Sequence, residues 1–170
     1  MRSEITGAPQ KSLRSTQPLF GGNCCVLDNS VAMRWLLASQ KPADQIYAES
    51  VLRSFTTAEA IVPHLWYLEA ANVLLAAEQR GEIGFEAIQF FITQLEDLPI
   101  QVDPLTTHQA FNRTLNIARI YKLSSYDAAY LELAIRKDHP LATLDKQLTK
   151  AAIDANVVLY LEHPFMQRQP

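Results

Sequence analysis

The chain has 170 residues, a length typical of one domain, and it can bury a hydrophobic core without disulfides or a structural metal. Its composition, 48% hydrophobic and 19% charged with only 5 glycines, excludes disordered and fibrous classes. The formal net charge of −3 excludes nucleic-acid binding by overall basicity, so any such role has to rest on a local site. No apolar run is long enough to span a membrane.

The two ends of the chain differ from its middle. Residues 1–22 lack periodicity and contain no apolar stretch of the roughly 7 to 15 residues that a secretory signal needs. We interpret them as a flexible leader, residues 23–162 as the folded domain and residues 163–170 as a tail. Cys24 and Cys25 are adjacent, so on a strand they point to opposite faces and do not bridge. This cysteine usage predicts a reducing, cytoplasmic location.

Short apolar runs alternate with segments of helical spacing. The runs, each read as a buried strand, are residues 24–27, 60–62, 100–102, 141–144 and 157–161. Helical spacing covers residues 43–55, 64–80, 85–98 and 106–121, and capping residues open further helices that reach Leu37, Lys137 and Asn156. This alternation predicts an α/β protein whose parallel sheet is covered by helices on both faces.

Four acidic side chains stand in apolar surroundings rather than on polar helix faces. Asp28 and Asp145 each end a predicted strand, while Glu69 and Asp127 lie near the first turns of predicted helices. A carboxylate in such a setting is costly to ionise unless it is paired or bound to a cation. Because parallel strands end along one edge of a sheet, where α/β proteins bind ligands, we expect the four acids to meet there.

The residue types of this expected cluster favour a hard divalent cation. No lysine or arginine lies in the apolar segments around the four acids, and oxygen ligands without cysteine or histidine select Mg²⁺ or Mn²⁺. Asn72 is three residues after Glu69 and so shares its helix face. Such a pocket suits phosphodiester cleavage, because a bound cation lowers the pKa of water and offsets the charge that develops on the phosphate.

Helix capping is the alternative role for three of the acids: Asp28, Asp127 and Asp145. Asp127 follows Ser124 by three residues, the spacing of a capping box. Glu69 has no capping role, because it lies within a helix among apolar neighbours. The set of four favours a metal site over caps alone.

Four short motifs occur in a specific order: LDNSVA at 27–32, EAAN at 69–72, SYDAAY at 125–130 and ATLD at 142–145. In these motifs the chain resembles PIN-domain proteins, and among them the VapC-type toxins of type II toxin–antitoxin systems. The resemblance covers about residues 25–161. It implies a three-layer α/β/α sandwich around a central, mainly parallel sheet of about five strands.

The resemblance also implies a site and an activity. Its catalytic acids fall on Asp28, Glu69, Asp127 and Asp145, with Asp28 and Asp127 as the principal Mg²⁺ ligands and Mn²⁺ as a possible substitute. The supporting hydrogen bonds fall on Ser30, Asn72 and Thr143. The implied protein is a Mg²⁺-dependent endoribonuclease that cuts tRNA, rRNA or mRNA, is blocked by a cognate antitoxin protein, forms a homodimer and involves no membrane.

Two other functions fit parts of the same pattern. A non-catalytic PIN-like scaffold would use the acids only as helix caps. A haloacid-dehalogenase-like phosphatase also has an aspartate after its first strand, but it needs a second aspartate two residues later, where this chain has Ser30.

Overall fold

The computed structural model describes residues 24–164, so the predicted leader at residues 1–22 lies outside the described residues. Its centre is a sheet of four parallel strands in the order β3-β2-β1-β4. The strands are β1 (Cys24–Leu27), β2 (Glu59–Val62), β3 (Ile100–Val102) and β4 (Leu141–Ala142). Val26 on the inner strand β1 pairs with Ile61 on one side and Leu141 on the other. The predicted α/β class with a parallel sheet is therefore confirmed.

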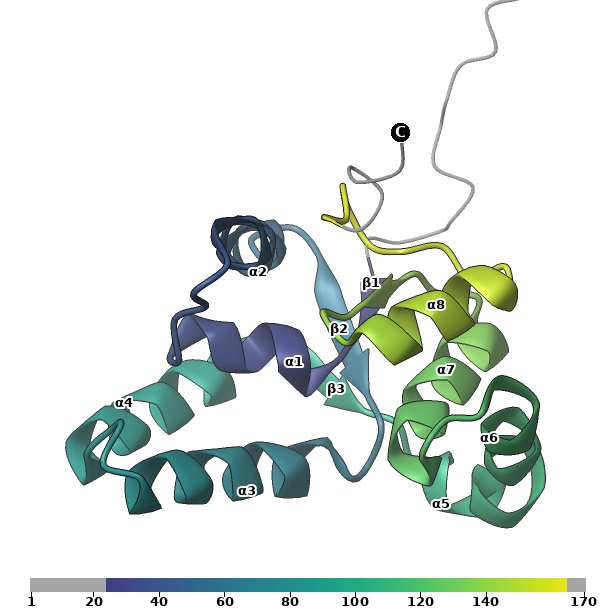
Figure 1. Ribbon diagram of the computed structural model, residues 1–170, viewed down its shortest axis with the longest axis horizontal. Coiled ribbons are helices and arrows are strands. Elements are labelled where there is room, and N and C mark those ends of the chain that lie inside the picture. Colours follow the sequence, from purple (N-terminus) through teal and green to yellow (C-terminus); the bar gives the residue numbers. More distant parts are fainter. Residues whose placement is uncertain (1–23, 165–170) are drawn as a thin grey trace, which may run out of the picture.

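Helices cover both sides of this sheet. Figure 1 shows α1, α2, α3 and α4 on one side and α5, α6, α7 and α8 on the other. Their bounds are α1 Asn29–Ala32, α2 Pro42–Ser54, α3 Trp66–Gln79, α4 Phe85–Glu96, α5 Thr106–Gln109, α6 Leu115–Tyr121, α7 Ser125–Lys137 and α8 Lys146–Asp154. A 3₁₀ turn, Met33–Trp35, follows α1. This arrangement is the three-layer sandwich that the sequence predicts.

The expected fifth strand at residues 157–161 does not form. Leu159 makes only an isolated parallel bridge to Leu141, so the described sheet has four strands and not about five. Asn156 and Leu161 adopt the left-handed backbone region, with φ of 58° and 57°, at the two ends of this segment. Residues in that region cannot continue an extended ladder, which limits the pairing to its middle.

The helix predicted at residues 106–121 is interrupted. A π-helical turn, Ala110–Thr114, separates α5 from α6. Periodicity alone does not reveal this insertion, because a single π turn disturbs the spacing of apolar residues only locally. The helices predicted at 43–55, 64–80 and 85–98 are confirmed within about two residues at each end.

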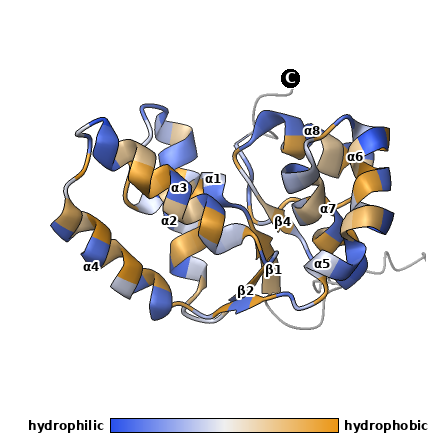
Figure 2. Cartoon of the chain, turned by 90° about the horizontal axis from the view of Figure 1, so that it is seen from below, coloured by the Kyte–Doolittle hydropathy of each residue, from blue (hydrophilic) through white to orange (hydrophobic). Residues whose placement is uncertain are grey.

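One hydrophobic core lies between the sheet and the helices. Figure 2 shows hydrophobic residues on the strands and on helix surfaces next to them. Trp66 of α3 and Tyr130 of α7 are the largest fully buried side chains. Cys24 and Cys25 are unbridged, as predicted, and burial raises the pKa of the Cys25 thiol. Among residues 24–164, no helix has the length and apolar character that crossing a bilayer requires.

Candidate active site

Asp28 lies at the carboxyl end of β1, an inner strand of the sheet. Its amide donates to the carbonyl of Ala142, at the end of β4 (2.9 Å). Its side chain is 8% exposed, and its Oδ2 accepts hydrogen bonds from Ser30 Oγ (2.5 Å) and Thr143 Oγ1 (2.6 Å). Although Asp28 occupies the N-cap position of α1, its side chain makes no capping hydrogen bond. Asp28 is therefore held at the sheet edge and does not serve as a helix cap.

The surroundings of Asp28 disfavour its charged form. Burial raises the pKa of this carboxyl, the hydrogen bonds from Ser30 and Thr143 lower it in part, and the nearby charge of Asp127 raises it again. The net pKa is raised, since neutral hydroxyl donors do not replace the lost hydration. A cation beside Asp28 would restore the charged form.

Glu69 approaches the same place from the first turn of α3. Its carboxyl is half-buried and accepts a short hydrogen bond from the hydroxyl of Tyr130. Burial raises the pKa of Glu69, and the charges of Asp28 and Asp127 raise it further, against the lowering effect of hydrogen bonds from Tyr130 and Asn29. Asp28, Glu69 and Asp127 therefore share one electrostatic environment, although they are far apart in the sequence.

Asp127 has two roles. Ser124 caps α7, because its Oγ accepts from the amide of Asp127 (3.0 Å), which is one half of the capping box that their spacing predicts. The same Oγ donates to Asp127 Oδ2 (2.6 Å), where a complete capping box would use the backbone amide of Ser124. The charge of Asp127 nevertheless contributes to the raised pKa values of both Asp28 and Glu69. A capping role at α7 thus does not remove Asp127 from the acidic cluster.

Asp145 and Asn72 are placed differently from the three clustered acids. Asp145 is exposed and caps α8, because its Oδ1 accepts from the amide of Leu148 (2.7 Å). Asn72 is also exposed, and its side chain makes no hydrogen bond within residues 24–164. Ser30 and Thr143 do contact the cluster through Asp28, and Ser30 Oγ also accepts from the amide of Leu144 (2.8 Å).

The carboxylate oxygens of this cluster are the ligand type that a hard cation prefers, but they do not form a closed cage around one point. Within the part of the chain that the structure describes, no lysine, arginine or histidine makes an ion pair with any of the four predicted acids. In the same residues, no three carboxylate, histidine or cysteine side chains converge closely enough to hold one ion. A cage of three side chains is not a requirement for Mg²⁺, which commonly keeps several waters and takes one or two carboxylates.

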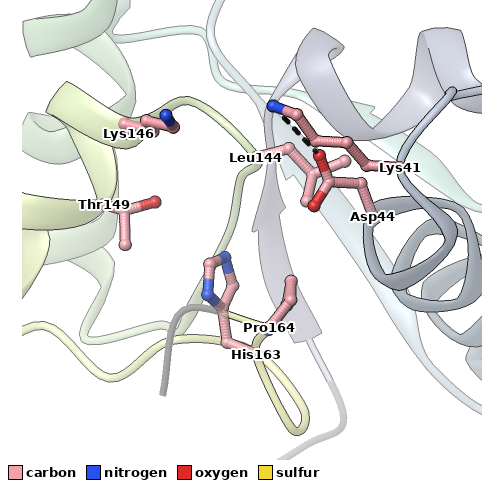
Figure 3. Close-up of a pocket in the computed structure, with 7 residues that line it drawn as sticks. All are labelled: Lys41, Asp44, Leu144, Lys146, Thr149, His163 and Pro164. Atoms are coloured by element: carbon pink, nitrogen blue, oxygen red, sulfur yellow. Dashed lines mark ion pairs between the residues drawn. The ribbon is translucent and has the colours of Figure 1, made fainter. Parts of the chain in front are cut away.

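A small hollow of about 60 Å³ lies next to Leu144, the residue after Thr143 (Figure 3). Its lining residues are Lys41, Asp44, Leu144, Lys146, Thr149, His163 and Pro164. The ring Nε2 of His163 lies 2.6 Å from the carbonyl oxygen of Thr143, the residue whose hydroxyl donates to Asp28. Burial lowers the pKa of His163. His163 therefore links the hollow to Thr143, but none of the clustered acids lines it.

Sequence reasoning missed a second group of buried charges. Asp103 is fully buried and receives two hydrogen bonds from the guanidinium of Arg136, at 3.2 and 2.8 Å. Arg136 also pairs with Glu132 (3.0 Å), which in turn contacts Arg113 of the π turn (3.2 Å). Asp103 directly follows β3, so the rule that selected Asp28 and Asp145 would have found it too. Its arginine partner makes this group structural rather than cation-binding.

The chain belongs to the PIN-domain family, whose family model matches residues 25–154. PIN domains are generally nucleases. The fold is also similar to the crystal structure of PAE2754 from Pyrobaculum aerophilum, with 20% sequence identity and a TM-score of 0.54 over 74% of this chain and 77% of that chain. No curated protein matches the chain in sequence. At this identity the structural likeness supports the fold alone.

Proposed function

We propose that this protein is a Mg²⁺-dependent endoribonuclease. The observation that carries the proposal is the position of Asp28: it is buried at the sheet edge, its pKa is raised, two more carboxylates lie near it, and no basic side chain of residues 24–164 pairs with it. Such a group is stable in its charged form only with a cation. Membership of the PIN family supports nuclease chemistry and leaves the haloacid-dehalogenase-like alternative without support.

Each residue of the site has a separate role in this proposal. In the proposal, Asp28 and Asp127 hold the cation, while Ser30 and Thr143 fix the Asp28 carboxylate from one side. Glu69 faces the same space and completes the cation site directly or through water. Asp145 completes the site through water from the start of α8. The cation, when bound, supplies a water of lowered pKa and offsets negative charge on the RNA phosphate.

Metal dependence is the first expected result. Mn²⁺ should raise the melting temperature progressively, approximately with the logarithm of its concentration above its Kd, since it binds the folded state alone. RNA cleavage should require Mg²⁺ or Mn²⁺ and stop on addition of EDTA. The measurements are a thermal melt across a Mn²⁺ titration and gel analysis of a structured RNA. A melting temperature that does not change with Mn²⁺, together with no RNA cleavage, would identify the protein as a non-catalytic scaffold.

Asp145 allows its capping role and its charge to be separated. Asparagine caps helices about as well as aspartate, whereas alanine costs about 1 kcal/mol. We expect Asp145→Asn to keep the wild-type melting temperature but to lower cleavage about 10-fold, the scale of a lost outer-sphere partner. Asp145→Ala should lower both. Full cleavage by Asp145→Asn would restrict this residue to the cap.

The toxin role rests on the resemblance to VapC-type proteins and includes a cognate antitoxin and a homodimer. Induction of the chain should arrest growth, and co-expression of the protein encoded by the adjacent gene should restore it. Arrest that persists beside every adjacent gene product would contradict the toxin assignment. The measurement is growth after induction, with sedimentation analysis of the purified chain to determine whether it dimerises.

A further inference from the structure

The hydroxyl of Tyr130 joins three separate segments next to the acidic cluster. Tyr130 lies on α7, one turn after Asp127, and its side chain is 1% exposed. Its hydroxyl donates to Glu69 Oε2 on α3. The same hydroxyl oxygen accepts from Asn29 Nδ2, at the start of α1 (3.3 Å). One buried oxygen thus connects the helices that carry Asp127 and Glu69 with the residue after Asp28.

The orientation of this chain of hydrogen bonds is determined by its far end. Asn29 Nδ2 also donates to the backbone carbonyl of Trp66 (2.8 Å), an oxygen that can only accept. The amide nitrogen therefore faces both Trp66 and Tyr130. With Asn29 donating to its oxygen, the hydroxyl of Tyr130 directs its own hydrogen toward Glu69.

This arrangement leaves Asn29 with a buried side-chain oxygen, Oδ1, that has no hydrogen-bond partner among the described residues, which a role in stability does not explain. An unsatisfied buried acceptor is destabilising, and such groups in folded proteins call for an explanation beyond packing. An apolar side chain at position 29 would avoid that cost but would remove the donor that orients Tyr130.

We infer that Tyr130, oriented by Asn29, is a positioning residue that holds the Glu69 carboxylate beside Asp28. Glu69 has three rotatable side-chain bonds and is only half-buried, so α3 alone does not determine where its carboxylate lies. The short hydrogen bond from the Tyr130 hydroxyl, together with the one from Asn29, fixes the position of the carboxylate next to α1, the helix that follows Asp28. The inference rests on the proposed metal-dependent function and assigns Glu69 its support.

The test is Tyr130→Phe, which removes one oxygen and keeps the ring. Partners of this kind typically change metal affinity or activity by about 10- to 100-fold when they are lost. We expect Mn²⁺ to bind at least about 10-fold more weakly by calorimetry and kcat to fall similarly, while the KM for RNA stays constant. Tyr160→Phe is the matched control, because its hydroxyl donates to Ser54 Oγ (3.0 Å), outside the cluster.

A double variant separates positioning from a general structural effect. If Tyr130 acts through Glu69, adding Tyr130→Phe to Glu69→Gln should produce no further loss of Mn²⁺ affinity. Equal Mn²⁺ affinity in Tyr130→Phe and wild type, or additive losses in the double variant, would overturn the inference. Absence of Mn²⁺ binding and cleavage in the wild-type protein would instead overturn the proposed function, and this inference with it.

Discussion

Asp28→Asn is expected to lower metal-dependent RNA cleavage on the order of 100-fold or more, because it removes the buried charge that would hold the cation. The fold should survive. Asparagine has the same shape as aspartate, and the hydroxyls of Ser30 and Thr143, which now donate to Asp28, can either donate or accept. The measurements are cleavage rate with Mg²⁺, Mn²⁺ affinity by calorimetry and melting temperature.

The melting temperature of Asp28→Asn distinguishes a functional carboxylate from a structural one. Burial and the charge of Asp127 raise the pKa of Asp28, so in the absence of metal the Asp28 carboxylate destabilises the folded state at neutral pH. We expect the metal-free variant to melt at the wild-type temperature or above it, while activity is lost. Retention of a tenth or more of the activity, or a large drop in melting temperature, would contradict the assignment.

The sequence predicted most of the fold because the central strands are short apolar runs. Cys24–Leu27 and Glu59–Val62 are almost wholly buried, and a parallel strand covered on both faces shows as a continuous apolar run. The same rule failed at residues 157–161, which are equally apolar. There the left-handed backbone of Asn156 and Leu161, which no apolar pattern encodes, restricts pairing to one bridge.

For the site, the sequence could show which acids lie at the sheet edge but not what each one contacts. Asp28 was predicted to lie in the cluster because it follows a strand, and Glu69 because it lies among apolar residues in a helix. Both lie in one acidic environment in the structure. The contact between Glu69 and Tyr130 joins residues 61 positions apart, so it depends on how α3 and α7 are placed across the sheet. Local patterns carry no information about that placement.

The second large effect is expected at the buried charges outside the site. Arg136→Met should lower the free energy of unfolding by about 3–5 kcal/mol, the cost of leaving a buried charge without its partner. Asp103 would be the main residue left unpaired, since Glu132 keeps its contact with Arg113. Urea unfolding measures the effect. Arg53→Met is the matched control: its exposed pair with Glu49 should contribute less than about 1 kcal/mol.

The pH dependence of that loss identifies its cause. Burial would raise the pKa of Asp103, but the hydrogen bonds from Arg136 and Thr106 and the charge of Arg136 outweigh it and lower the pKa. A depressed pKa contributes stability above the unfolded value of about 3.9, and that contribution disappears as pH falls through the folded pKa. Without Arg136, burial raises the pKa of Asp103 instead, so Asp103 of the variant takes up a proton at a higher pH. Once Asp103 is neutral, the variant no longer loses stability through an unpaired buried charge. The stability difference between wild type and Arg136→Met should thus be largest near neutral pH and begin to narrow above about pH 4, as Asp103 of the variant takes up its proton. It should narrow further as pH falls through the lowered pKa of Asp103 in the wild type. A difference that stays constant over this range would point to lost packing by Arg136 rather than to the charge of Asp103.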